Sequence, residues 1–171
     1  MRTLLDRRAL LRRCFGACVV ALPGASRRAS GQILYRSLRK PVVVPLARLA
    51  DVWKPFPFRA LAQKANGGQV RLQGLLMRVP DPASASTALR AFCLLCPHEI
   101  CQVNFVPDPS RLRLEPANKP LFVCPCHFSV FDPAADGACL SGPAPRGLYR
   151  FAVQVRARQA EVSQVEQQAL E

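Results

Sequence analysis

The sequence predicts an all-β protein, and three observations support this class. Short apolar stretches in the body alternate with polar residues at a period of two, as in half-buried strands. The 16 prolines and nine glycines favour short strands joined by turns over a helical bundle. No helical periodicity is sustained beyond the N-terminal leader, and no internal repeat occurs. With 171 residues, half of them hydrophobic, the chain can form one domain with a packed core and a short appendage.

Five strands are expected around the cysteine-rich region. In chain order they are residues 41–49, 55–62, 69–79, 91–95 and 148–158. Pro41 and Pro45 indicate that the first is an edge strand. Asn66-Gly67-Gly68 marks a turn before the third strand, and residues 80–86 read as a loop. The fourth strand leads directly into Cys96, and residues 160–171 form either a final strand or a frayed end.

Residues 1–40 are interpreted as a twin-arginine-type signal, or as a short N-terminal anchor, followed by a linker. The pair Arg7-Arg8 precedes an apolar run from Cys14 to Ala25 and then small residues, the order of a secretory signal. That run is well short of the ~20 residues that span a bilayer as a helix. We therefore expect export by the twin-arginine route to the periplasmic side of a bacterial inner membrane. A leader that is kept would also associate the protein with the membrane.

The net charge of +13 suggests a nucleic acid or an anionic membrane as partner, but its distribution excludes nucleic acid. Residues 1–40 hold ten of the 24 basic groups against one acid, Asp6. The other 131 residues hold 14 basic and ten acidic groups. We therefore expect most of the excess charge to belong to the leader.

Two clusters carry the candidate chemistry: Cys96-Pro97-His98-Glu99-Ile100-Cys101 and Cys124-Pro125-Cys126-His127. Together they contain both histidines and four of the eight cysteines. The pattern C-x-H, a spacer, then C-x-x-H supplies two thiolates and two imidazoles. This is the ligand set of a 2Fe–2S cluster in which two cysteines hold one iron and two histidines hold the other.

The same four ligands could instead form a tetrahedral zinc site, which would make the chain a zinc-stabilised binding module. The cysteines left over argue against zinc, since each cluster has one to spare, Cys101 and Cys126. One extra cysteine in each loop suggests a disulfide between the loops. A disulfide requires an oxidising compartment, in agreement with the leader. Zinc stays open as the alternative.

At these residues the chain resembles the Rieske iron–sulfur proteins, in particular the disulfide-containing branch of cytochrome bc complexes and arsenite oxidase small subunits. The resemblance covers about residues 41–158, with the specific motifs confined to 93–147. It implies a Rieske domain over 41–165, an antiparallel β base with a small cluster-binding subdomain at about 91–147. It also implies that Cys96 and Cys124 hold one iron, that His98 and His127 hold the other, and that Cys101 and Cys126 form the disulfide.

The resemblance further implies three residues around the cluster. Pro143 lies in Ser141-Gly142-Pro143-Ala144-Pro145, which is similar to the proline loop that covers the cluster in this family. In the bc branch a serine and a tyrosine donate hydrogen bonds to cluster sulfurs, which raises the reduction potential. Here Ser129 is kept, but Phe131 stands in place of the tyrosine, so we expect a lower potential.

The loops differ from the bc pattern at two further positions. Glu99-Ile100 replaces the Leu-Gly of the quinol-docking tip, and an acidic group there disfavours standard quinol docking. Phe128 stands where glycine is usual, and the run around it is closer to arsenite oxidase small subunits. We expect Phe128 either to mark this difference or to pack within the cluster-binding subdomain.

The function expected is electron transfer, within a periplasmic or membrane-bound oxidoreductase complex. The chain has no separate substrate-pocket signature, so we expect a redox subunit rather than an enzyme by itself. A quinol–cytochrome c reductase-like complex with cytochrome b or c type partners comes first, and an arsenite-oxidase-like molybdoenzyme with a molybdopterin subunit is the alternative. A cytosolic ferredoxin is disfavoured by the leader and the spare cysteines. Cys93 is expected to pack in the core, and Cys139 is expected either to pack likewise or to lie next to the cluster.

Overall fold

The computed structural model describes residues 33–112 and 118–171, which belong to one compact unit. The expected signal lies outside these residues and stays a prediction. The strands are β1 Tyr35–Pro45, β2 Phe56–Gln63, β3 Gln69–Pro80, β4 Thr87–Cys93, β5 Asn104–Val106, β6 Leu121–Val123, β7 Val130–Asp132, β8 Ala138–Ser141, β9 Arg150–Arg156 and β10 Gln159–Glu166. Three short 3-10 helices accompany them: η1 Leu46–Leu49, η2 Pro109–Leu112 and η3 Gln167–Leu170. In the part of the chain described, no helix is long and apolar enough to cross a bilayer.

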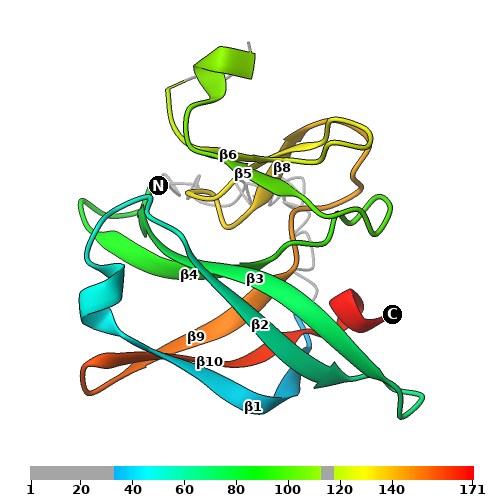
Figure 1. The fold of residues 1–171 in the computed structure, drawn as a ribbon. Helices are drawn as coiled ribbons and strands as arrows, with labels where there is room; N and C mark the ends of the chain where they lie inside the picture. Colours follow the sequence, from blue (N-terminus) through cyan, green and yellow to red (C-terminus); the bar gives the residue numbers. More distant parts are fainter. Residues whose placement is uncertain (1–32, 113–117) are drawn as a thin grey trace, which may run out of the picture. The chain divides into compact units, whose positions relative to one another are not determined.

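Six strands form a closed antiparallel barrel in the order β1-β10-β9-β4-β3-β2 (Figure 1). The hairpin of β2 and β3 is paired along its whole length, from Phe56 opposite Leu76 to Gln63 opposite Gln69. Its turn contains Gly67 at φ +82°, a conformation that glycine adopts without steric cost. The barrel closes between β1 and β2 through one pair, Leu38 and Ala62.

The other four strands form a separate sheet in the order β5-β6-β7-β8, inserted between β4 and β9. The edge-to-face contact of Phe92 from β4 and Phe122 from β6, with ring centroids 5.3 Å apart, packs this sheet against the barrel. The hydrophobic cluster around these rings also contains Cys96 and Cys124. The inserted sheet and the candidate ligands therefore share one core, apart from the core inside the barrel.

The all-β prediction is confirmed, and the expected second and third strands match β2 and β3 to within one residue at each end. The first strand is wrong in its bounds, because β1 begins at Tyr35 and residues 46–49 form η1. It is also not an edge strand, because the barrel is closed. Pro41 is tolerated since it lies in the register break between Ser37 and Val42, where strand pairing is interrupted.

Of the two alternatives expected for the C-terminal segment, the final strand is confirmed. Residues 160–171 contain a final strand, β10, rather than a frayed end. The expected strand at 91–95 lies earlier as β4, and Leu95 instead makes an isolated bridge with Gln102. The strands of the inserted sheet were not predicted, because with three or four residues each they are too short to show an alternating pattern.

Candidate metal centre

Two loops of the same construction carry the candidate ligands. In the first, residues 96–101 after β4, the Cys96 amide donates a hydrogen bond to the Cys101 carbonyl over 2.8 Å. In the second, residues 124–129 between β6 and β7, the Cys124 amide donates to the Ser129 carbonyl over 2.9 Å. Each loop is thus closed by a backbone bond from its first residue to its sixth. We call them the first and the second ligand loop.

The four candidate ligands form two pairs that differ in exposure, Cys96 with Cys124 and His98 with His127. The Cys96 and Cys124 side chains are buried, at 2% and 1% exposure. The imidazoles of His98 and His127 face each other with ring centroids 4.8 Å apart and planes at 89°. The His127 side chain is 45% exposed. The structure therefore places two thiols toward the core and two imidazoles toward solvent.

These residues fit a metal centre with two sulfur and two nitrogen ligands. The Nδ1 atom of His98 is buried and has no hydrogen-bond partner among the described residues, an unfavourable arrangement unless something binds there. Burial raises the pKa of the Cys96 thiol, and the neighbouring Cys124 thiol raises it further. Metal binding to these thiols would therefore have to displace their protons. The set could hold a two-iron cluster, with the thiols on the inner iron and the imidazoles on the outer one.

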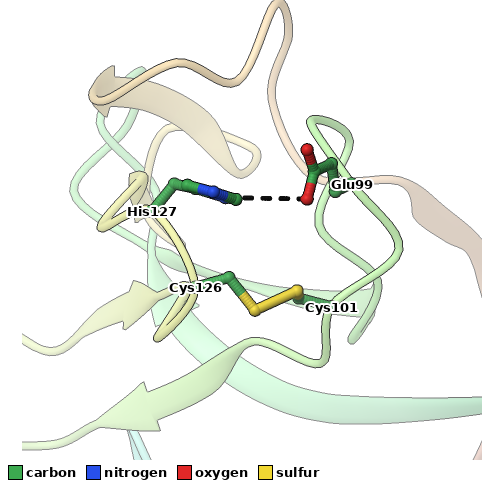
Figure 2. The surroundings of a disulfide bond; sticks show 4 residues. All are labelled: Glu99, Cys101, Cys126 and His127. Carbon is green, nitrogen blue, oxygen red and sulfur yellow. Dashed lines mark ion pairs between the residues drawn. A yellow bond between two sulfur atoms is a disulfide. The ribbon is translucent and has the colours of Figure 1, made fainter.

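A disulfide between Cys101 and Cys126 joins the two ligand loops, with a Cα–Cα distance of 6.6 Å (Figure 2). This confirms the expected pairing. Glu99 of the first loop faces His127 of the second, with Oε2 3.8 Å from Nδ1 (Figure 2). The disulfide consumes the spare cysteine of each ligand loop, so Cys96 and Cys124 are the thiols that the two loops leave for a metal.

Residues 141–145, the proline loop, rest directly on the second ligand loop. The Ala144 amide donates to Ser129 Oγ over 3.2 Å, which leaves the hydroxyl proton of this buried serine free to be donated elsewhere. Gly142 has φ +91°, and a Cβ atom added there would lie 2.5 Å from Ser129 Cα. Pro143 itself is exposed. Ser129 and Gly142 thus hold the proline loop beside the candidate ligands.

Phe128 of the second ligand loop and Phe131 of β7 differ in exposure. Phe131 is fully buried in β7, in the cluster that contains Cys96 and Cys124. Phe128 is 70% exposed and has φ +55°, so the packing expected for it is wrong. The second ligand loop turns through a left-handed conformation at this residue, which favours glycine and directs the ring into solvent. Ile100 of the first loop is also exposed, at 87%.

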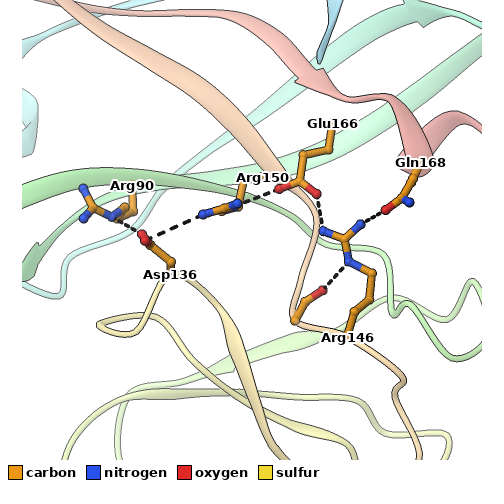
Figure 3. A network of polar contacts seen from close by, with 7 residues as sticks. Arg90, Asp136, Arg146, Arg150, Glu166 and Gln168 are labelled. Atoms are coloured by element: carbon orange, nitrogen blue, oxygen red, sulfur yellow. Dashed lines mark hydrogen bonds and ion pairs between the residues drawn. The ribbon is translucent and has the colours of Figure 1, made fainter. Parts of the chain in front are cut away.

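A charged network that was not expected holds the proline loop to the barrel (Figure 3). Arg146, directly after the loop, contacts the Glu166 carboxylate and the Gln168 side chain. Glu166 is 1% exposed, and its other oxygen accepts a hydrogen bond from Arg150 Nε over 2.8 Å. The Asp136 carboxylate, between β7 and β8, contacts Arg90 and lies 3.6 Å from Arg150. The sequence did not reveal this network, because nothing in the Gln-rich tail indicates that Glu166 is buried. The available signal for it was Arg146, the arginine at the end of the proline loop.

Of the two remaining cysteines of the body, Cys93 is buried as expected, while Cys139 is partly buried against the hydrophobic cluster that contains Cys96 and Cys124. Cys93 lies in the barrel core with no exposed surface, and burial raises the pKa of its thiol to about 12. Cys139 lies in β8 opposite Phe131 and donates a weak hydrogen bond to the Ser141 carbonyl over 3.4 Å. Neither belongs to the candidate ligand set.

Comparisons with known proteins identify the family of this chain. Residues 64–156 match the model of the Rieske [2Fe-2S] domain family. Among solved structures, the plasma membrane Rieske protein PetC3 from Synechocystis PCC 6803 is 28% identical, with a TM-score of 0.34, over 61% of this chain and 84% of that one. The soluble domain of the Rieske protein II (soxF) from Sulfolobus acidocaldarius is 15% identical, with a TM-score of 0.44, over 78% of each chain. No curated protein matches the chain.

Proposed function

The chain belongs to the Rieske [2Fe–2S] domain family, and we propose that it is the iron–sulfur subunit of a quinol–cytochrome c reductase-like complex. Membership makes it an electron-transfer protein that binds a 2Fe–2S cluster and works with partner proteins. The cluster supplies a centre that accepts and releases one electron. The proposal concerns the residues that hold the cluster, the complex that the protein serves and the compartment in which it works.

We assign Cys96 and Cys124 to the inner iron and His98 and His127 to the outer iron. The burial of the two thiols and the exposure of His127 support this order. The disulfide between Cys101 and Cys126 keeps the two ligand loops at a fixed separation when the charge of the centre changes. The Ser129 hydroxyl could donate its proton to a cluster sulfur, since its oxygen already accepts from Ala144. The buried Phe131 excludes water there but offers no donor.

The observation that carries electron transfer to a partner is the solvent-facing end of the two ligand loops. His127, Ile100 and Phe128 are exposed there, and the last two are apolar. An apolar rim around an exposed imidazole suits a partner that buries this end while it exchanges an electron. The proline loop beside Ser129 is the feature that the bc branch shares.

A molybdoenzyme partner is the second candidate, favoured by Glu99 and Phe128. Glu99 places a carboxylate 3.8 Å from His127 at the same end, and burying it against an apolar quinol pocket would be costly. A partner surface with a cationic group could pair with it instead.

We further propose that the protein works on the periplasmic side of a bacterial inner membrane after export by the twin-arginine route. The disulfide supports an oxidising compartment, and the sequence of the leader supports export.

Two experiments test these proposals. Reduced protein should give the EPR signal of a 2Fe–2S cluster, with iron and sulfide in equal amounts; an EPR-silent protein that contains zinc would contradict the ligand assignment. The Cys96→Ser variant should lose the signal, while the Cys93→Ser variant, changed at a buried cysteine outside the ligand set, should keep it. Purification of the native complex then identifies the partner: a haem b subunit supports the reductase, and a molybdopterin subunit supports the alternative.

A further inference from the structure

The positive charge of the folded body is concentrated in its first three strands. Residues 33–80, which contain β1, β2 and β3, hold nine basic groups and a single acid, Asp51. Residues 81–171 hold eight basic and nine acidic groups, so they are almost neutral. Because β1 begins at Tyr35, residues 35–40 belong to the barrel and not to the leader. The expectation that most of the excess charge belongs to the leader therefore overstates the charge of the leader. One side of the barrel carries a large share of the excess charge.

On this side a hollow of about 410 Å³ opens between β1 and β2. It lies where β1 pairs with β2 only at Leu38, beside the segment of β1 in which the pairing with β10 is interrupted between Ser37 and Val42. Half of its lining residues are cations, Arg39, Lys40, Arg59 and Arg71, and the other half are apolar. Leu61, which lies opposite Arg71 in the β2–β3 hairpin, is an apolar member and is 40% exposed.

None of the four cations forms an ion pair or a side-chain hydrogen bond within the described residues. Other arginines of the barrel are engaged: Arg78 donates to the Leu49 carbonyl, and Arg150 is paired with Glu166. Four like charges around one hollow repel each other, and a bound anion would remove this repulsion. The combination of unpaired guanidinium groups and an apolar lining suits an anion attached to an apolar body.

We propose that this hollow binds the headgroup of an anionic phospholipid and holds the barrel against an anionic bilayer. The guanidinium groups of Arg59 and Arg71 contact the phosphate, and Leu61 and Val42 contact the apolar part of the lipid below it. Basic groups at a membrane surface contribute roughly equal increments to binding, about fivefold in affinity each.

The position of the hollow favours a bilayer over an acidic redox protein as the occupant. The inserted sheet leaves the barrel at β4 and returns at β9, and β1 lies on the other side of the closed ring (Figure 1). A protein that exchanges electrons has to approach the ligand loops of the inserted sheet. A bilayer bound at β1 and β2 leaves those loops accessible.

The test is co-sedimentation of the full cluster-loaded chain with vesicles of equal parts phosphatidylcholine and phosphatidylglycerol, compared with phosphatidylcholine alone. The double variant Arg59→Gln/Arg71→Gln should bind the anionic vesicles about 25-fold more weakly. The matched control, Arg156→Gln/Arg158→Gln, loses the same charge at two exposed residues outside the hollow and should bind nearly as the wild type. Any contribution of the basic leader is the same in all three proteins.

Equal binding by the two double variants, or no preference of the wild type for anionic vesicles, would overturn the proposal. Binding of poly-L-glutamate that depends on Arg59 and Arg71, without binding to vesicles, would assign the surface to an acidic protein and also overturn it. A Leu61→Asn variant should lose the part of the binding that survives high salt. The EPR signal should be unchanged in all variants, so failure here is distinct from failure of the proposed electron-transfer role.

Discussion

The buried carboxylate of Glu166 accepts a hydrogen bond from Arg150 Nε over 2.8 Å, and its second oxygen contacts Arg146 (Figure 3). One side chain of the last strand thereby pairs with two arginines, one in β9 and one that follows the proline loop. Because the carboxylate is 1% exposed, water cannot replace either partner.

Replacing Glu166 with glutamine should therefore lower the free energy of unfolding by about 2 kcal/mol, because the amide keeps one acceptor oxygen while its NH2 group cannot accept from the second arginine. Urea denaturation of the cluster-free protein measures this. The control is Asp51→Asn, which removes an exposed pair with Lys54, where both side chains are about two-thirds exposed. That variant should lose less than about 1 kcal/mol. A loss of similar size in both variants would contradict the role of burial.

The contact of Gly142 with Ser129 makes a second prediction. Gly142→Ala combines a positive φ with a Cβ atom that meets the Ser129 backbone, so it should cost about 3 kcal/mol. Gly67→Ala is matched in backbone conformation, with φ +82°, but its Cβ would meet no atom within 4 Å. It should cost about 1 kcal/mol. Equal losses of unfolding free energy in urea denaturation would mean that the backbone angle alone determines the cost. The proline loop would then move to make room for the added Cβ atom.

Removal of the disulfide should destabilise the loops. The double variant Cys101→Ser/Cys126→Ser frees a segment of 25 residues that the bond closes, which should cost about 3 kcal/mol. The cluster-loaded variant should also lose its visible absorbance faster in the presence of an iron chelator. Wild-type protein incubated with a thiol reductant should behave like the variant; if it keeps the stability of the untreated protein, the disulfide does not stabilise the loops.

Phe131→Tyr should raise the reduction potential of the cluster. A new donor beside Cys96 and Cys124 stabilises the more negative reduced state, and one hydrogen bond to a charged group corresponds to about 60 mV for a one-electron couple. Protein-film voltammetry measures the midpoint. Phe131→Leu keeps the site apolar and should leave the midpoint nearly unchanged, while Ser129→Ala should lower it. An unchanged midpoint in the Phe131→Tyr variant would exclude the missing hydrogen bond at residue 131 as a cause of a lower potential.

Cys93 should make the protein less stable at alkaline pH. Burial raises the pKa of its thiol from 9.0 to about 12. As the pH rises above 9, the unfolded chain loses this proton while the folded protein keeps it, so stability present below pH 9 is lost. The loss should approach about 1.4 kcal/mol per pH unit between pH 9 and 12. It should be absent in Cys93→Ala, and urea midpoints measured for both proteins across this range test it.

The sequence predicted those parts of the molecule that depend on local pattern or on rare residue types. Strands β2 and β3 were predicted because the turn signal Asn66-Gly67-Gly68 and the alternation of residues 69–79 are local patterns. The candidate ligands were predictable because the chain has only two histidines, each beside a cysteine at a metal-binding spacing. The disulfide pairing followed from the family resemblance.

Other parts depend on contacts between distant residues. Leu121–Val123 and Val130–Asp132 are buried on both faces, so neither β6 nor β7 shows an alternating pattern. Glu166 is buried because Arg146 and Arg150 reach it from other segments, and its own neighbours in the sequence are ordinary tail residues. The exposure of Phe128 depends on a backbone angle that its sequence context does not reveal.

The pairing of β1 with β10 has a consequence for how the protein is made. These strands join Tyr35 to Glu166, so the barrel joins the beginning of the folded body to its end. During synthesis β1 has no full-length partner until β10 has left the ribosome, because its contact with β2 is limited to Leu38 and Ala62. Folding of the barrel is therefore completed only after translation has passed residue 166, and a chain that stops after β9 leaves β1 with an unpaired, aggregation-prone edge.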